Sequence, residues 1–193
     1  MLCATTLNSG SAADSRYPDW PCVQAKVPEI SLVSVWDGGP IESAVLEWRD
    51  DQSIRDLVTR LAARRVPIDA AQKLILDFFA GATTKSKVGT DLFAGLFETL
   101  NSQRSEVMNG LERLHRSLKG LAAHIKTDTS LLRELQDKIP ADESKISELG
   151  ERIEWSTRIF EDRRKTIKYA CEAPVIIERR LYALTRTIRQ AMQ

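Results

Sequence analysis

Two long heptad patterns, separated by one proline-containing break, constrain this chain more than any other feature. Apolar residues recur at alternating spacings of three and four, the pattern by which one helix packs along another. The first seam comprises Phe93, Phe97, Leu100, Val107, Leu111, Leu114, Leu118, Leu121, Ile125, Leu132, Leu135 and Ile139. The second comprises Ile146, Leu149, Ile153, Ser156, Phe160, Arg163, Ile167, Ala170, Pro174, Ile177, Leu181, Leu184, Ile188 and Ala191. The pattern predicts an αα-hairpin with arms at about 88–139 and 142–192.

The break between the seams, KIPADES, contains the signals for ending one helix and starting another. Pro140 ends the first helix, and either Asp142 or Ser144 can cap the second. An uninterrupted arm of about 50 residues would extend ~75 Å. Two arrangements are open: a projecting antiparallel coiled coil, or a bundle in which shorter helices pack on the hairpin. We expect the bundle near 93–107 and 174–184, and the coiled coil towards Pro140.

Three charged residues occupy seam positions: Arg104, Asp128 and Arg163. Buried polar seam residues disfavour slipped pairings, so these three are expected to set the register of the hairpin. The residues around Asp128, from Thr127 to Ser130, are poor helix formers, so they could break the first arm and fold it back into a shorter bundle.

The remaining sequence favours short helices and an extended N-terminal segment. Only 6% of residues are aromatic, and glycine and proline are modest, a composition that predicts an all-α fold rather than sheets. Residues 41–81 read as short helices, with Ser53 as an N-cap, a separation at Pro67 and an end at Gly81. Their predicted core residues are Leu57, Leu61, Leu74, Ile75, Phe78 and Phe79. The predicted helical domain is 41–193, and residues 14–40 form an extended N-terminal strap whose ISLVSVW run could be a single strand without a sheet.

The first 13 residues are small, apolar or hydroxylic and end in a small-x-small pattern that resembles a signal peptidase site. They lack the basic n-region and the full apolar h-region of a signal peptide. We expect this if the true translation start lies upstream of Met1. The alternative is a plain unstructured tail. Removal of this segment would discard Cys3 and leave Cys22 and Cys171, an even count typical of an oxidising compartment.

A Cys22–Cys171 disulfide would hold the strap on the second arm, and a chain-entropy argument gives it roughly 4 to 5 kcal/mol. Two buried free thiols are the alternative; a catalytic thiol is disfavoured because no histidine lies near either cysteine in the sequence. Pro174, three residues after Cys171, should kink or restart the helix, which makes this region a docking place for the strap.

The sequence contains none of the familiar catalytic, phosphate-binding or metal-binding motifs. His115 and His124 lie on one predicted helix without a carboxylate or cysteine at metal-ligand spacing, so we predict no metal, cofactor or catalytic residue. The formal net charge of +1 argues against a nucleic-acid partner. One alternative remains, a helical protein with an arginine-lined pocket. Such a protein could be a chorismate mutase-like enzyme or a binder of small ligands. Its cations would be Arg60, Arg64, Arg65 and Lys73, which could instead pair with Asp56 and Asp69.

Five stretches carry a family resemblance: DWPC, VSVWDGGP, DLFAGLFETLN, WSTRIFEDRRKTIKYACEAP and IERRLYALTRTI. Across nearly the whole chain after residue 13, they resemble an uncharacterised family of secreted helical proteins in proteobacteria. The resemblance implies an exported, helical protein and implies no activity, ligand or catalytic residue.

These features together predict a helical bundle with a long antiparallel coiled-coil hairpin and an extended N-terminal strap. We expect a non-enzymatic protein, periplasmic or secreted, that acts as a scaffold or interaction module for a protein partner or through self-association. We expect no stable membrane insertion of the mature chain. A cytoplasmic coiled-coil adaptor is the alternative, and it requires both cysteines to stay reduced.

Overall fold

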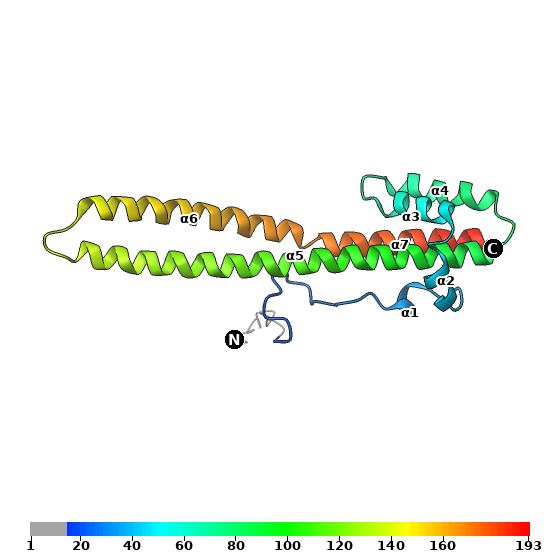
Figure 1. The fold of residues 1–193 in the computed structure, drawn as a ribbon, viewed down its shortest axis with the longest axis horizontal. Coiled ribbons are helices and arrows are strands. Elements are labelled where there is room, and N and C mark those ends of the chain that lie inside the picture. Colours follow the sequence, from blue (N-terminus) through cyan, green and yellow to red (C-terminus); the bar gives the residue numbers. More distant parts are fainter. Residues whose placement is uncertain (1–14) are drawn as a thin grey trace, which may run out of the picture. The chain divides into compact units, whose positions relative to one another are not determined.

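The computed structural model describes residues 15–193, and these form an all-α chain without strands (Figure 1). The helices are α1 (Leu32–Val35), α2 (Glu42–Glu47), α3 (Gln52–Ala62), α4 (Ile68–Ala80), α5 (Lys85–Gln136), α6 (Glu143–Ala170) and α7 (Ala173–Met192). The predicted helical class and the extended strap are confirmed, although part of the ISLVSVW run forms one helical turn rather than a strand. The proposed signal segment, 1–13, and Cys3 lie outside the described residues.

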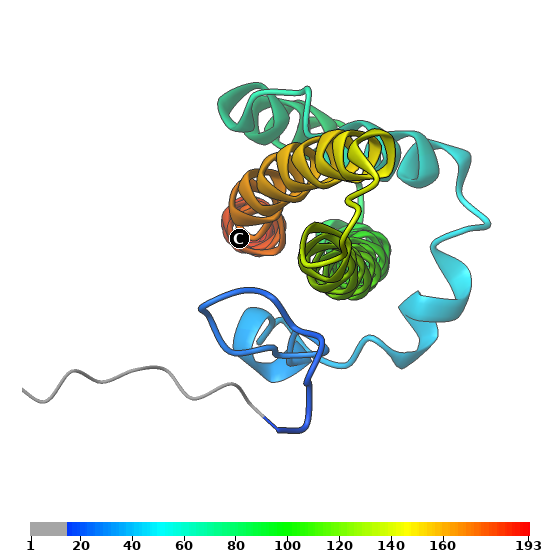
Figure 2. The ribbon, with the colours of Figure 1, turned by 90° about the vertical axis from the view of Figure 1, so that its left-hand side faces the viewer.

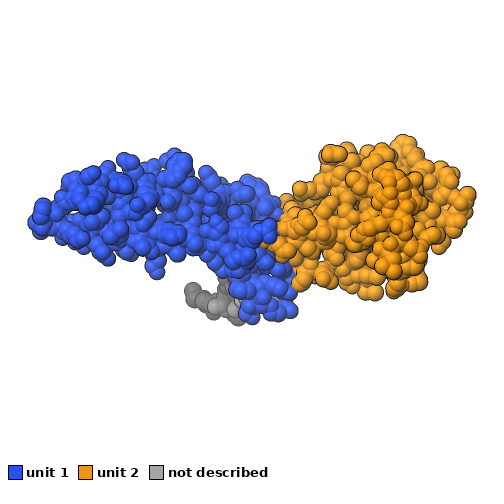
Figure 3. All heavy atoms as spheres, viewed as in Figure 1, with its two compact units in different colours: residues 1–26, 110–171 blue, residues 27–109, 172–193 orange. Residues whose placement is uncertain are grey.

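The chain divides into two compact units, shown in different colours in Figure 3. Of the described residues, unit 1 contains 15–26 and 110–171, and unit 2 contains 27–109 and 172–193. Residues 41–193, expected to make one helical domain, are therefore shared between the two units. Helix α5 contributes its C-terminal part to unit 1 and its N-terminal part to unit 2.

In unit 1, α5 runs antiparallel to α6 and is continuous through Asp128 (Figure 1). The hydroxyl groups of Thr127, Thr129 and Ser130 donate to carbonyl oxygens four residues earlier, at 3.1, 2.7 and 3.2 Å. These poor helix formers satisfy their hydroxyl groups within the helix, so the break considered at Asp128 does not occur. Ile139, predicted as the last seam residue, lies beyond the end of α5 and is 99% exposed, so this seam assignment is wrong.

The two helix starts for which a cap was predicted both use an aspartate. Asp142, one of the two predicted candidates, caps α6 by accepting from the backbone nitrogen of Lys145 at 3.2 Å. At α3 the predicted cap, Ser53, is wrong. The Asp51 carboxylate accepts from the backbone nitrogens of Ser53 and Ile54, at 2.8 and 3.2 Å, and therefore satisfies two donors that the first turn leaves free.

The second arm consists of two helices because it restarts before Pro174. Cys171 is the C-cap of α6, Glu172 is the N-cap of α7, and Pro174 lies in the first turn of α7. A proline in the first turn lacks only a backbone N–H that has no intrahelical acceptor anyway. The helix restart therefore accommodates both Cys171 and Pro174 without the loss of an interior hydrogen bond.

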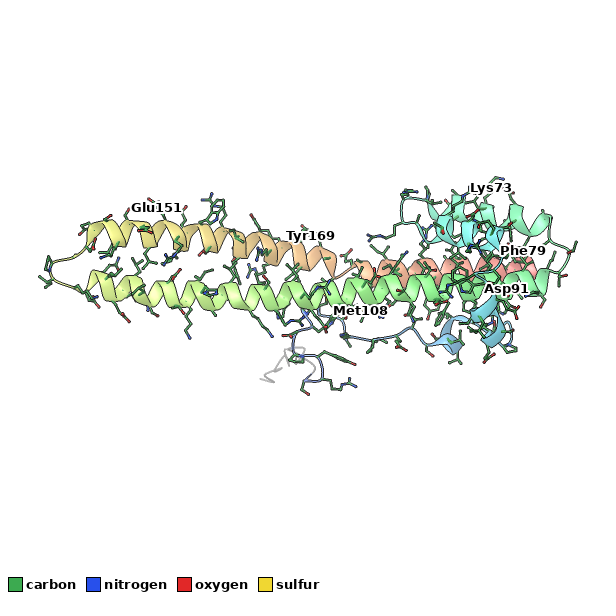
Figure 4. All side chains as sticks on the ribbon, viewed as in Figure 1. Lys73, Phe79, Asp91, Met108, Glu151 and Tyr169 are labelled. Atoms are coloured by element: carbon green, nitrogen blue, oxygen red, sulfur yellow. A yellow bond between two sulfur atoms is a disulfide. The ribbon has the colours of Figure 1, made fainter. Side chains whose placement is uncertain are left out.

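In unit 2, the N-terminal part of α5 pairs with α7, and other elements of the unit cover this pair on two sides. Helices α3 and α4 lie on one side, and α1 and its flanking segment lie on the other (Figures 1 and 2). Of the predicted core residues, Leu57, Leu61, Ile75 and Phe79 (Figure 4) are buried, and Leu74 and Phe78 are partly buried.

Gly95 permits close helix packing in this core. A Cβ atom at position 95 would lie 2.7 Å from Val58 Cγ2 and 2.9 Å from the Trp48 ring. Any larger residue would have to displace α3 or Trp48, so glycine determines how closely α5 approaches them.

Candidate interaction surfaces

A disulfide between Cys22 and Cys171 attaches the strap to α6 in unit 1, as predicted. The two Cα atoms are 5.6 Å apart, and 149 residues separate the cysteines in the sequence. The Gln24 side-chain amide donates to the Cys171 carbonyl oxygen at 2.5 Å, and the Trp20 indole donates to the Gln24 carbonyl oxygen at 2.7 Å. The covalent link therefore lies within a local hydrogen-bond network.

Ion pairs fix the same segment to α5. Asp19 accepts from Lys119 at 2.9 Å and from Arg116 at 3.2 Å, and these hydrogen bonds lower the pKa of Asp19. Lys26 pairs with Glu112 at 2.6 Å, and both side chains are largely buried. The strap residues of unit 1 thus contact both helices of the hairpin.

The strap residues of unit 2 are held by backbone and aromatic contacts. The Pro28 carbonyl oxygen accepts from Arg104 at 3.1 Å, and the Ile30 backbone nitrogen donates to Asn101 at 3.3 Å. Trp36 is buried and stacks on Phe93, with ring centroids 4.1 Å apart. Trp36 is therefore a packing residue rather than an exposed binding anchor.

The three predicted polar seam residues lie in different environments. Arg104 is 4% exposed, and its Nε atom donates to Glu178 at 2.6 Å across unit 2. In unit 1, Asp128 accepts two hydrogen bonds from Arg152, at 3.0 and 3.2 Å. Arg163 is exposed and donates to the Ser117 hydroxyl at 3.1 Å. All three link different helices, but Arg104 alone among them is buried, and their control of register stays a prediction.

Two large aromatic side chains are exposed on α6. Trp155 is 62% exposed and Tyr169, near the C-terminal end of α6, is 77% exposed (Figure 4). The two residues are two heptads apart, so they lie on nearly the same side of the helix, separated by about 21 Å. Asp162 lies midway and pairs with Lys165 at 3.9 Å. We name this surface, defined by Trp155, Asp162 and Tyr169, the α6 aromatic face.

The cations predicted to line a pocket do not converge. Lys73 pairs with Asp77 at 3.1 Å on the surface of α4, away from the long helices (Figure 4). Arg60 and Arg65 are exposed, and neither forms a hydrogen bond or ion pair with another residue in the described range 15–193. Arg64 lines a hollow of about 350 Å³ together with Arg179 and Arg180, and Arg60, Arg65 and Lys73 do not line this hollow.

A larger arginine-lined hollow, of about 720 Å³, lies between α1 and α7 in unit 2. We name it the α7 hollow. Its lining includes Ser34 from α1 and Arg179, Tyr182, Thr185, Arg186 and Arg189 from α7. This site was not predicted from the sequence, although its signal is present: Arg179, Tyr182, Arg186 and Arg189 follow the i, i+3, i+7, i+10 spacing of one helix face.

Neither histidine belongs to a metal-binding group. Burial lowers the pKa of His115, and the positive charge of Lys119 lowers it further. The negative charge of Asp19 acts in the opposite direction and partly offsets this decrease. His124 is exposed. Within 15–193, no three histidine, cysteine, aspartate or glutamate side chains are grouped to hold a metal ion. None of the helices in this range has both the length and the apolar composition required to cross a membrane.

Comparison of the chain with protein-family models found no match, and comparisons with curated proteins and with solved structures found no significant similarity.

Proposed function

We propose that this protein is an exported, non-enzymatic interaction module whose coiled-coil unit binds a protein partner through the α6 aromatic face. The exposure of Trp155 and Tyr169 carries the proposal. Large aromatic side chains on one side of a helix are the residues that most often dominate protein–protein binding energy. Their spacing of about 21 Å suits a partner helix or an extended protein surface rather than a small molecule.

The disulfide supports the exported part of the proposal. Structural disulfides persist in oxidising compartments and are rare where glutathione keeps thiols reduced. Cys22 and Cys171 are joined, and no motif of a redox enzyme surrounds them. The small-residue N-terminal segment and the resemblance to secreted helical proteins point in the same direction.

Site-specific photocrosslinking in the native host tests the partner surface. A photoreactive residue would replace Trp155 or Tyr169, and the matched controls would carry it at Thr157 or Lys168. The control positions are also exposed on α6, about half a turn around the helix from Trp155. We expect one discrete adduct with another protein from positions 155 and 169 and none from positions 157 and 168.

The protein identified in the adduct would then be purified and titrated with the full-length, oxidised chain. The double variant Trp155→Ala and Tyr169→Ala should bind at least about tenfold more weakly, because aromatic hot spots typically contribute more than a factor of ten each. Equal crosslinking from all four positions, adducts with a second copy of the chain alone, or unchanged affinity of the double variant would each refute the proposal.

A further inference from the structure

We propose that the α7 hollow of unit 2 binds a small organic molecule with two anionic groups, either carboxylates or phosphates, about 10 Å apart. The hollow, at about 720 Å³, has the size of a small-molecule site. This inference concerns unit 2 and is independent of the partner surface proposed on α6.

Two of the three arginines that line the hollow have no counterion among the described residues. Arg179 and Arg186 form neither an ion pair nor a hydrogen bond with any residue of the described range. Arg189 pairs with Asp37 at 2.6 Å, and both of these side chains are about half exposed. Among the described residues, none with a carboxylate lines the hollow. The wall therefore presents two uncompensated guanidinium groups to an anion.

The spacing of these arginines defines the ligand. Arg179 and Arg186 are seven residues apart on α7, which corresponds to about 10 Å along the helix axis. Each guanidinium can form two parallel hydrogen bonds with one carboxylate or phosphate. Tyr182 lies between them, half-exposed, and its hydroxyl donates to Ser34 of α1 at 3.3 Å. The ring offers an apolar surface to the linker between two anionic groups.

A buried hydroxyl on the same wall also lacks a partner. Thr185 is 2% exposed, and its Oγ1 atom forms no hydrogen bond within the described residues. By contrast, the nearby Thr187 hydroxyl donates to the Ala183 carbonyl oxygen at 3.2 Å. A buried hydroxyl without a partner destabilises a fold, so a ligand oxygen bonded to Thr185 would satisfy it.

The smaller hollow extends the same cationic surface. Arg179 lines both hollows, and Arg180 in the smaller one donates to the carbonyl oxygens of Leu61 and Val66, at 2.7 and 2.9 Å. The remaining Arg180 nitrogen, Nη2, is buried and has no partner in 15–193. The arginine lining is therefore continuous around Arg179.

Calorimetric titration of the full-length, oxidised protein at constant ionic strength tests the proposal. The probes are sebacate and hexane-1,6-diyl bisphosphate, with anionic groups about 10 Å apart, and succinate, with closer carboxylates. We expect one site per chain, and at least about tenfold weaker binding of succinate. A preference for sebacate or for the bisphosphate distinguishes a carboxylate from a phosphate ligand.

The double variant Arg179→Gln and Arg186→Gln should weaken binding of the preferred long probe at least about tenfold, because each substitution removes a charge-assisted contact. The matched control, Arg60→Gln and Arg65→Gln, removes two unpaired arginines of the same unit outside the hollow and should bind as wild type. Equal losses in both double variants, unchanged affinity in the first, or no binding of either sebacate or the bisphosphate at about 10 mM would overturn the proposal.

Thr185→Val tests the hydroxyl separately, since valine keeps the shape and removes the oxygen. We expect a higher melting temperature without ligand and several-fold weaker binding of the preferred long probe. If the affinity is unchanged, the Thr185 hydroxyl does not contact the ligand, and its part in the site is refuted.

Discussion

The two units use the same helical elements but bury very different amounts of apolar surface. The hydrophobic cluster of the described residues lies wholly in unit 2, where the N-terminal part of α5 contributes Leu92, Phe93, Leu96 and Leu100 at 0% exposure. Among the described residues of unit 1, the buried apolar ones are Leu111, Leu118, Leu149, Ile167 and the disulfide-bonded Cys171. One continuous helix, α5, thus serves a globular core at one end and a two-helix seam at the other.

The difference follows from the number of elements around α5. Two paired helices can bury only one narrow stripe of each, and most seam residues of unit 1 are accordingly half-buried. In unit 2, α7, α3, α4 and the strap cover α5 from several sides. We infer that unit 2 is stabilised mainly by apolar burial, whereas unit 1 depends on its disulfide and ion pairs.

Loss of the disulfide should have the largest effect. In the chain-entropy account, closing a loop between residues 149 apart contributes about 5 kcal/mol to the free energy of unfolding. The double variant Cys22→Ser and Cys171→Ser should lose most of this free energy of unfolding, as measured by urea denaturation. The reduced wild-type protein should show the same loss. Hydrogen exchange should show loss of amide protection around the strap residues of unit 1. A change below about 1 kcal/mol would contradict the importance of the link.

The second-largest effect should come from removing a buried aromatic ring, and its size should differ between the two units. Phe93→Ala eliminates a fully buried ring that stacks on Trp36, so we expect a loss of about 4 kcal/mol in unfolding free energy. The matched change in unit 1, Leu132→Ala at a half-buried seam position, should lose only about 1 to 2 kcal/mol. Equal losses for the two variants would show that burial does not distinguish the units.

The polar seam residues provide a smaller contrast. Arg104→Met removes a buried cation from Glu178 and from the Pro28 carbonyl oxygen, and should lower the unfolding free energy by about 2 kcal/mol. Arg163→Met, at an exposed position of unit 1, should change it by less than about 0.5 kcal/mol. Urea unfolding of both variants measures the difference. If Arg163→Met lost more unfolding free energy than Arg104→Met, the conclusion that Arg104 is the more important polar seam residue would be wrong.

The smallest expected effect is a pH dependence in unit 1. Because burial lowers the pKa of His115 in the folded state, the unfolded chain binds more protons as pH falls below the ordinary histidine value, about 6.5. The stability associated with neutral His115 is therefore complete above that pH and decreases as pH falls towards the folded pKa. His115→Gln should flatten the dependence of melting temperature on pH between about 7.5 and 5, with His124→Gln as control. Identical slopes in the two variants would contradict this role.

Periodicity and helix-ending residues predicted much of the fold. The two seams, the end before Pro140, the restart at Pro174 and the Cys22–Cys171 pairing all follow from local spacing or from cysteine count. The cap at Asp51 and the continuity of the helix at Asp128 were harder to predict from the sequence. The reason is that serine, threonine and aspartate side chains can form hydrogen bonds either as helix caps or within a helix. Which of these occurs depends on the acceptor or donor available in the folded chain.

The amino-acid sequence by itself determined the helical class, the two arms and the positions where they stop. Only the tertiary structure decided that Arg104 is buried while Arg163 is exposed, and that Ser34 and Tyr182 close a hollow lined by arginines. A seam pattern states which side of a helix is apolar and contains no information about how many other elements cover it. The burial of Arg104 and the closure of the hollow by Ser34 and Tyr182 depend on residues far apart in the sequence, so they exist only once the strap and the helices have packed.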